Sequence, residues 1–148
     1  MQNNIRRTRG FTLVELITTV VILGILTGIA YPSYTKWVQQ SRRADAYRSL
    51  TELANRLERN YLNANTYTTD LTDFGYLAAT NVTVEGGMYQ IRVDAPTAAC
   101  PIVSCYVVTA SPVAGTVQAN DAMCTSLSLS STGVKSATGS NPGACWDK

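Results

Sequence analysis

A run of twenty-one residues, from Phe11 to Tyr31, contains a single charged side chain, Glu15. Three arginines, at positions 6, 7 and 9, come just before the run. As a helix the run would be about 32 Å long at roughly 1.5 Å per residue, enough to cross a bilayer core of about 30 Å. A run of this length needs an apolar environment, so it constrains the fold more than any other feature of the chain.

Two ordinary explanations account for only part of this run. A secretory signal would explain the basic start, and Gly28-Ile29-Ala30 resembles its small-residue cleavage site, but the run is longer than the apolar core of such a signal. A membrane anchor explains the length but not Glu15, because a carboxylate deep in lipid costs about 2.5–3.5 kcal/mol and usually has a partner. Glu15 therefore indicates a more specific role for the segment.

The stretch RGFTLVELITTVVILGILTGIAYPSY, residues 9–34, resembles the N-terminus of a type IV prepilin, and SRRADA at 41–46 continues the likeness. The resemblance implies that a prepilin peptidase cleaves between Gly10 and Phe11 and methylates the new amine of Phe11. It also implies three parts: a leader peptide (1–10), a hydrophobic transmembrane and filament-core helix (11–34) and a pilin globular domain (35–148).

Cleavage would leave a positive amine on Phe11, four residues before Glu15 and about 6 Å away along a helix. The resemblance implies that Glu15 pairs with the amine of a neighbouring subunit, and a charge pair in an apolar core would fix axial register. A pair within one helix is the alternative. Pro32 is expected to bend or interrupt the helix because it lacks a donor. By resemblance, the segment from Gly24 to Pro32 partly melts in the filament.

Residues 35–62 are expected to continue the helix, because apolar side chains recur there at spacings of three and four. These side chains are Tyr47, Leu50, Ala54, Leu57 and Tyr61. Residues 63–81 have the composition of a loop with short irregular pieces, and residues 136–143, small and polar, that of a surface loop. Thr132-Gly133 is a turn signal. Strands are expected at Met88–Val93, Cys105–Ala110, Thr116–Ala119 and Leu127–Ser131.

These elements predict an α+β protein, in which a long N-terminal helix packs its amphipathic half on a C-terminal antiparallel β-sheet. The resemblance implies the same architecture, the pilin fold.

Four cysteines lie in the last third of the chain, at Cys100, Cys105, Cys124 and Cys145. An even, clustered set behind an export-type N-terminus predicts two disulfides in an oxidising compartment, and the sequence allows three pairings. Zinc is the alternative, but the spacings include no CxxC and the chain has no histidine. The resemblance implies that Cys124 and Cys145 close a loop near the C-terminus, which leaves Cys100 and Cys105 to pair with each other.

Composition argues against catalysis. The absence of histidine removes the commonest general base and metal ligand, so we expect no enzyme, cofactor or metal. From Phe11 onward nine basic side chains face ten acidic ones, which does not fit a generally nucleic-acid-binding protein.

The expected function is that of a structural subunit of a type IV pilus, a filament that serves cell adhesion and twitching motility. Its expected partners are other pilin subunits, the prepilin peptidase, an inner-membrane assembly platform and, before assembly, the membrane. The expected location is the inner membrane, with the globular domain in the periplasm, and then a pilus outside a Gram-negative-type bacterium. One alternative is a minor pilin that captures DNA for uptake, for which the candidate binding residues are Arg92, Lys135, Trp146 and Lys148. Another alternative is a pseudopilin of type II secretion.

Overall fold

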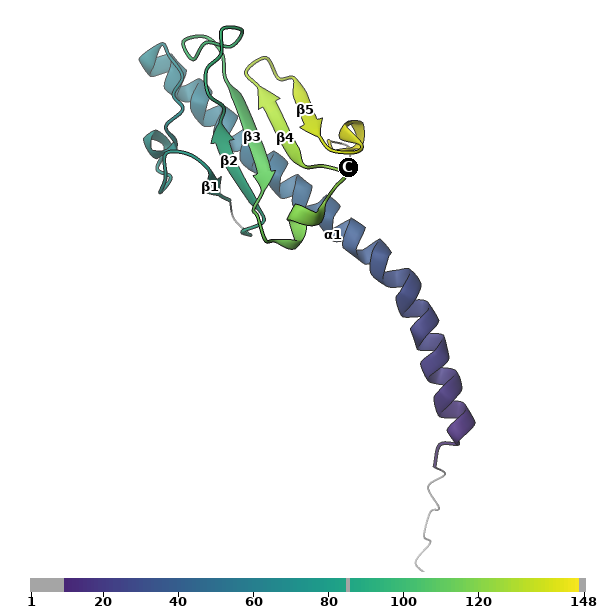
Figure 1. The fold of residues 1–148 in the computed structure, drawn as a ribbon. Helices are drawn as coiled ribbons and strands as arrows, with labels where there is room; N and C mark the ends of the chain where they lie inside the picture. Colours follow the sequence, from purple (N-terminus) through teal and green to yellow (C-terminus); the bar gives the residue numbers. More distant parts are fainter. Residues whose placement is uncertain (1–9, 85, 147–148) are drawn as a thin grey trace, which may run out of the picture. The chain divides into compact units, whose positions relative to one another are not determined.

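The computed structural model describes residues 10–84 and 86–146, and it divides into two compact units, one up to Trp37 and one from Val38 onward. Helix α1 (Leu13–Ala64) belongs to both units (Figure 1). The other elements all belong to the second unit: η1 (Leu71–Phe74), β1 (Val82–Thr83), β2 (Tyr89–Val93), β3 (Val107–Pro112), η2 (Val117–Asn120), β4 (Ser126–Ser130), β5 (Lys135–Thr138) and η3 (Pro142–Ala144).

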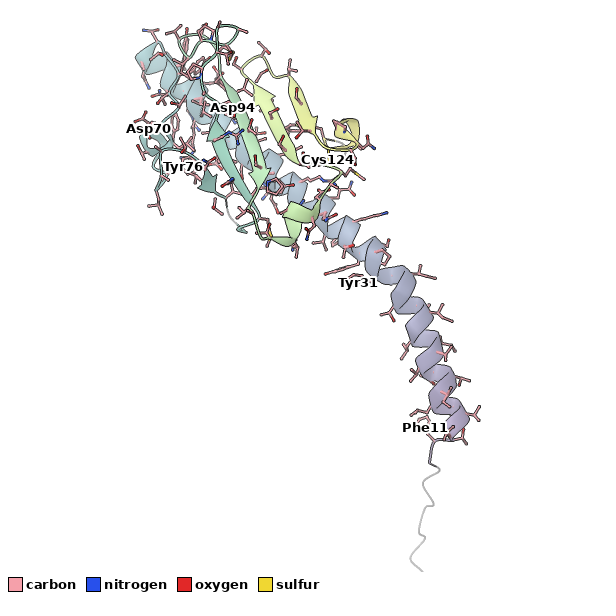
Figure 2. All side chains as sticks on the ribbon, in the orientation of Figure 1. Phe11, Tyr31, Asp70, Tyr76, Asp94 and Cys124 are labelled. Carbon is pink, nitrogen blue, oxygen red and sulfur yellow. A yellow bond between two sulfur atoms is a disulfide. The ribbon has the colours of Figure 1, made fainter. Side chains whose placement is uncertain are left out.

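The first unit is an apolar helix without a covering layer of its own. Its most apolar window has a mean hydropathy of 2.3, none of that window is buried, and its length suffices to cross a membrane. Figure 2 shows side chains projecting from all sides of the helix between Phe11 and Tyr31. The helix continues through Pro32 without interruption, and the expected bend at this residue stays a prediction.

The second half of α1 buries one stripe of side chains. Ala46, Leu50, Leu53 and Leu57 are all fully buried, at spacings of four, three and four. The buried stripe lies a fraction of a turn away from the expected one. Tyr47, which was expected within the stripe, is 38% exposed and lies at its edge. Ala46 and Leu53, which the sequence analysis did not single out, are therefore also part of the helix contact.

The stripe packs on a five-stranded antiparallel sheet in the order β1-β2-β3-β4-β5, so every strand pairs with its neighbour in sequence (Figure 1). One row of opposed residues crosses all five strands: Val82, Ile91, Ala110, Leu127 and Ala137. Side chains alternate between faces along a strand, so this row and the core residues Tyr89, Val93 and Val108 cover the buried face. The predicted α+β class is confirmed.

One expected strand is wrong. Residues 117–119 fall in the 3-10 helix η2, Thr116 is its N-cap, and Gly115 before it has the left-handed conformation (φ 81°). The Thr116 hydroxyl donates to the carbonyl of Val113 at 2.7 Å, and the side chain of Gln118 is fully buried. The turn at Gly115 and the buried side-chain amide of Gln118 are not compatible with a strand, whose side chains alternate between two faces.

Two strands were not expected from sequence, β1 and β5. Strand β5, Lys-Ser-Ala-Thr, overlaps residues 136–143, for which a surface loop is expected. The sequence does not predict a strand there because β5 has no large apolar side chain. It becomes a strand through the hairpin turn at Gly133 (φ 79°), where the amide of Ser130 donates to the carbonyl of Val134 at 3.0 Å. Its neighbour β4 supplies the hydrogen-bond partners that its own composition does not predict.

Candidate functional site

The start of α1 is organised by Thr12, which the sequence analysis did not single out. Its hydroxyl accepts a hydrogen bond from the amide of Glu15 at 3.3 Å, the arrangement of a helix N-cap. Helix α1 therefore begins at Leu13, and in the uncut chain Phe11 lies before the first turn rather than inside it. The Thr-x-x-Glu spacing of a capping box was the signal in the sequence.

The residues around the expected cleavage point are accessible. Phe11 is 84% exposed, Gly10 and Glu15 are also exposed, and a Cβ atom built on Gly10 would meet nothing within 4 Å. Residues 1–9 of the expected leader, with their three arginines, lie outside the described residues. Nearby hydroxyls are satisfied within the helix, since those of Thr18 and Thr19 donate to carbonyls one turn earlier at 2.7–3.0 Å.

A second polar site lies in the core of the second unit, where Arg43 and Asp121 form a two-pronged ion pair. Nε of Arg43 donates to Oδ2 of Asp121 and Nη2 to Oδ1, each at 2.8 Å. The two side chains are only 9% and 2% exposed. Because such a pair is costly to break once it is buried, it fixes the connection between β3 and β4 to α1.

Gln118 extends this network to the sheet. Its Nε2 donates to Oδ2 of Asp121 at 3.0 Å and to the hydroxyl of Tyr89 at 2.9 Å, and its Oε1 is buried without a partner among the described residues. Burial raises the pKa of Tyr89 to about 12, although the hydrogen bond from Gln118 acts in the opposite direction. Sequence reasoning missed the network, yet Arg43 stands three residues before Ala46, on the line of the buried stripe, and a charge at that position was the available signal.

The structure joins Cys124 to Cys145 and Cys100 to Cys105, the pairing that the resemblance implied. Cys124, labelled in Figure 2, is fully buried, and Cys145 is 4% exposed. The segment between them is more than a loop, because it contains β4, β5 and η3. Gly139 is needed at this point, since a Cβ there would meet the carbonyl oxygen of Met123 at 2.2 Å.

Of the basic residues considered for DNA, the two that the structure describes lie on opposite faces of the sheet. Arg92 lies opposite Thr109, in the row that continues to Ser128 and Ser136 on the solvent face, and it pairs with Asp94 at 2.9 Å. Lys135 lies opposite Leu129, whose row contains the buried residues Val108 and Val93, and so it is on the other face of the sheet. Lys148 lies outside the described residues.

Trp146 packs rather than projecting freely. Its ring meets that of Tyr47 edge-on with centroids 5.3 Å apart, and its Nε1 donates to the carbonyl of Ser136 at 2.8 Å. The Lys135 ammonium lies over both rings, 4.9 Å from the centre of Tyr47 and 5.6 Å from that of Trp146. Among residues 10–84 and 86–146, no group of acidic, cysteine or histidine side chains is arranged to hold a metal ion.

An exposed apolar helical segment that leads into a helix packed on an antiparallel meander defines a pilin-type protein. The family model "Type IV minor pilin ComP, DNA uptake sequence receptor" matches residues 32–128, and the model "Prokaryotic N-terminal methylation motif" matches residues 5–31. The chain belongs to the type IV pilin family.

The chain is also similar to parts of individual proteins. The chain is 30% identical over 96 residues to the "Type IV major pilin protein PilA" of Myxococcus xanthus, covering 65% of this chain and 41% of that protein. It is 44% identical over 39 residues to the "Fimbrial protein EcpC" of Eikenella corrodens, 26% of each. The matches thus span less than half the length of these relatives. A type IV pilin structure from Shewanella oneidensis is 24% identical, with a TM-score of 0.49, over 74% of this chain and 99% of that one.

Proposed function

We propose that this chain is a structural subunit of a type IV pilus that polymerises with other pilin subunits through the first half of α1. The observation that carries the proposal is the exposed apolar surface of this half together with Glu15 near its start. An α-helix that is apolar on all sides is stable only in lipid or among other helices. Membership of the pilin family supports both environments in succession, first the membrane and then the filament.

Processing is the first step of the proposal. A prepilin peptidase cuts between Gly10 and Phe11 and methylates the amine of Phe11, and an inner-membrane assembly platform then receives the subunit. Before assembly the chain crosses the inner membrane once, with its globular domain in the periplasm; afterwards it lies in a pilus outside a Gram-negative-type cell. The match of the methylation-motif model to residues 5–31 supports this step.

Assembly is the second step. The amine of Phe11 in one subunit pairs with Glu15 of its neighbour, so that subunits dock at one axial spacing. In the uncut chain, the described residues form no ion pair with Glu15. Pro32 and the glycines before it let the helix loosen between Gly24 and Pro32 once the subunit leaves the bilayer, because Pro32 removes one helical hydrogen bond.

Mass spectrometry of sheared surface filaments tests the proposal. The mature chain should begin at Phe11 and carry one methyl group. Gly10→Leu is the matched variant, because a Cβ atom at Gly10 meets no atom within 4 Å and the residue lies before the first helix. It should accumulate uncut in the membrane. Finding Met1, or a start at Tyr31, in assembled material would refute the processing step.

DNA capture is the second candidate function, favoured because residues 32–128 match a family model that describes a DNA uptake sequence receptor. The separation of Arg92 and Lys135 weakens a site built from these residues, since DNA binding needs several clustered cations. Retention of labelled duplex DNA by the domain from Thr35 onward tests it. Tight, salt-sensitive binding that falls in Lys135→Gln would establish the DNA candidate. We expect weak or no binding.

A further inference from the structure

The apolar half of α1 ends in three exposed aromatic side chains. Tyr31, Tyr34 and Trp37 are 71%, 64% and 65% exposed. At about 100° per residue they fall within an arc of about 120° around the helix. The rings of Tyr34 and Trp37 lie 6.4 Å apart between centroids, with an angle of 30° between their planes. Neither the cleavage step nor the Glu15 pair uses these rings.

Their position along the helix fits one boundary of a bilayer. From Phe11 to Tyr31 a helix rises about 30 Å, the thickness of the hydrocarbon core. Glu15 is the only charge between Phe11 and Tyr31, and Lys36 is the next one along the chain. Tyrosine and tryptophan concentrate where lipid meets water, because each ring is apolar at one end and has a hydrogen-bonding group at the other. A lysine beside them can lie along apolar surface and extend its charge to the phosphates.

The backbone at Pro32 fits the same boundary. Pro32 has no N–H, so the carbonyl of Gly28 loses its helical donor. Such a carbonyl is costly in hydrocarbon, whereas water can bond to it near the headgroups. Gly28 lies about 4.5 Å along the axis from Tyr31, close enough for water at the interface. The hydroxyl of Thr35 in turn donates to the carbonyl of Pro32 at 3.0 Å.

We propose that Tyr31, Tyr34 and Trp37 form an aromatic anchor, which binds the headgroup boundary of a phospholipid bilayer and sets the depth of the helix before assembly. The inference rests on the membrane stage of the proposed function. With Tyr31 at the outer boundary, Glu15 lies about 24 Å away along the axis, roughly one turn inside the opposite boundary. At that depth the carboxylate reaches hydrated headgroups. The aromatic anchor thereby keeps Glu15 within reach of water until a neighbouring amine replaces that water.

Depth-dependent quenching of Trp37 fluorescence tests this. The chain has two tryptophans, so Trp146→Phe leaves Trp37 as the only reporter. The full chain is reconstituted in phosphatidylcholine–phosphatidylglycerol vesicles that carry a nitroxide either beside the glycerol or near the end of an acyl chain. Trp37 should lose emission mainly to the shallow nitroxide. The matched control is Ile29→Trp in a background of Trp37→Tyr and Trp146→Phe, which keeps an aromatic ring with a hydroxyl at position 37 of the anchor. It lies about 12 Å deeper along the helix and should respond mainly to the deep nitroxide.

The outcomes separate the anchor from the membrane stage on which it rests. A chain that floats with the vesicles, and whose Trp37 is quenched like Ile29→Trp by the deep nitroxide, overturns the aromatic anchor alone. The anchor is also overturned if the chain floats with the vesicles and its Trp37 is quenched by neither nitroxide but only by iodide, a quencher that stays in the water. A chain that does not float with the vesicles overturns the membrane stage and the anchor together.

Discussion

The two halves of α1 follow the same backbone geometry and differ in what their side chains face. Up to Trp37, large apolar side chains are exposed on every side of the helix. From Val38 onward, a stripe centred on Leu50, Leu53 and Leu57 is buried against the sheet of the same chain. The sheet of the same chain therefore covers the apolar stripe of the second half, whereas the apolar surface of the first half needs lipid or other subunits to cover it.

Each half also carries one charge on its apolar surface, and these two charges behave differently. Arg43 has a partner within its own unit, because Asp121 meets it in a buried pair. Glu15 has no ion-pair partner among the described residues. A buried charge with an internal partner stabilises one arrangement of the fold, whereas a charge that awaits an external partner is suited to controlling assembly.

The largest expected effect comes from Glu15→Ala. If the filament core buries the pair with the Phe11 amine, its loss costs about 3–5 kcal/mol, which is about a hundred-fold or more in subunit affinity. Membrane insertion should persist or improve, because a carboxylate leaves the apolar run. The amount of the chain in purified pili measures the effect.

Thr18→Ala is the matched control for Glu15→Ala, since the Thr18 hydroxyl bonds only to carbonyls of its own helix. It should assemble normally. Normal incorporation of Glu15→Ala, as the only copy of the chain, would contradict the assembly role of this carboxylate.

The next effect is on folding, through Asp121→Ala. Arg43 would remain buried without its partner, which lowers the free energy of unfolding by about 3–5 kcal/mol. Urea denaturation of the domain from Thr35 onward measures this. Replacing both partners with apolar side chains, as in Arg43→Met with Asp121→Leu, should recover most of the loss. A loss below about 1 kcal/mol in Asp121→Ala would mean that the pair is hydrated like a surface ion pair.

Cys145→Ser should have a somewhat smaller effect. Opening a loop of 21 residues removes about 3 kcal/mol in the chain-entropy account. Protease cleavage after Lys135 should increase while leader cleavage stays unchanged. Cys105→Ser, which opens a loop of five residues, should cost about 2 kcal/mol. A peptide map that joins either Cys100 or Cys105 to Cys124 or Cys145 would contradict this assignment.

The smallest effect is a dependence of stability on alkaline pH. Burial raises the pKa of Tyr89 from 10.0 to about 12, so the unfolded state loses this proton first as the pH rises. The stability that Tyr89 contributes is complete below pH 10 and is lost between pH 10 and about 12, at about 1.4 kcal/mol per pH unit. Burial also raises the pKa of Tyr106, whose hydroxyl donates to Glu58 at 2.9 Å, and it adds to the same loss.

Urea denaturation across this pH range, with tyrosinate absorbance as the ionisation signal, measures the slope. Tyr89→Phe should be less stable at neutral pH, because Gln118 loses an acceptor, and should show a shallower alkaline slope. An unchanged slope in Tyr89→Phe would mean that Tyr89 ionises as it does in the unfolded chain.

Local patterns were sufficient for much of the architecture. The helix from the apolar run to the end of the amphipathic stripe, the class of the fold and three of the five strands follow from periodicity over neighbouring residues. Residues 9–34 carry a family motif, on which the proposed cleavage point and the proposed role of Glu15 rest. These features lie within short segments of the chain, so the sequence contains their physical cause directly.

Tertiary structure decided the features that depend on residues far apart in the chain. Lys135–Thr138 is a strand because β4 offers a hydrogen-bonding edge, and residues 117–120 form a helical turn around a buried Gln118. The ion pair of Arg43 joins residues 78 positions apart. No period or motif near either residue predicts such a contact, because its energy exists only after the chain has brought the two side chains together and removed the water between them.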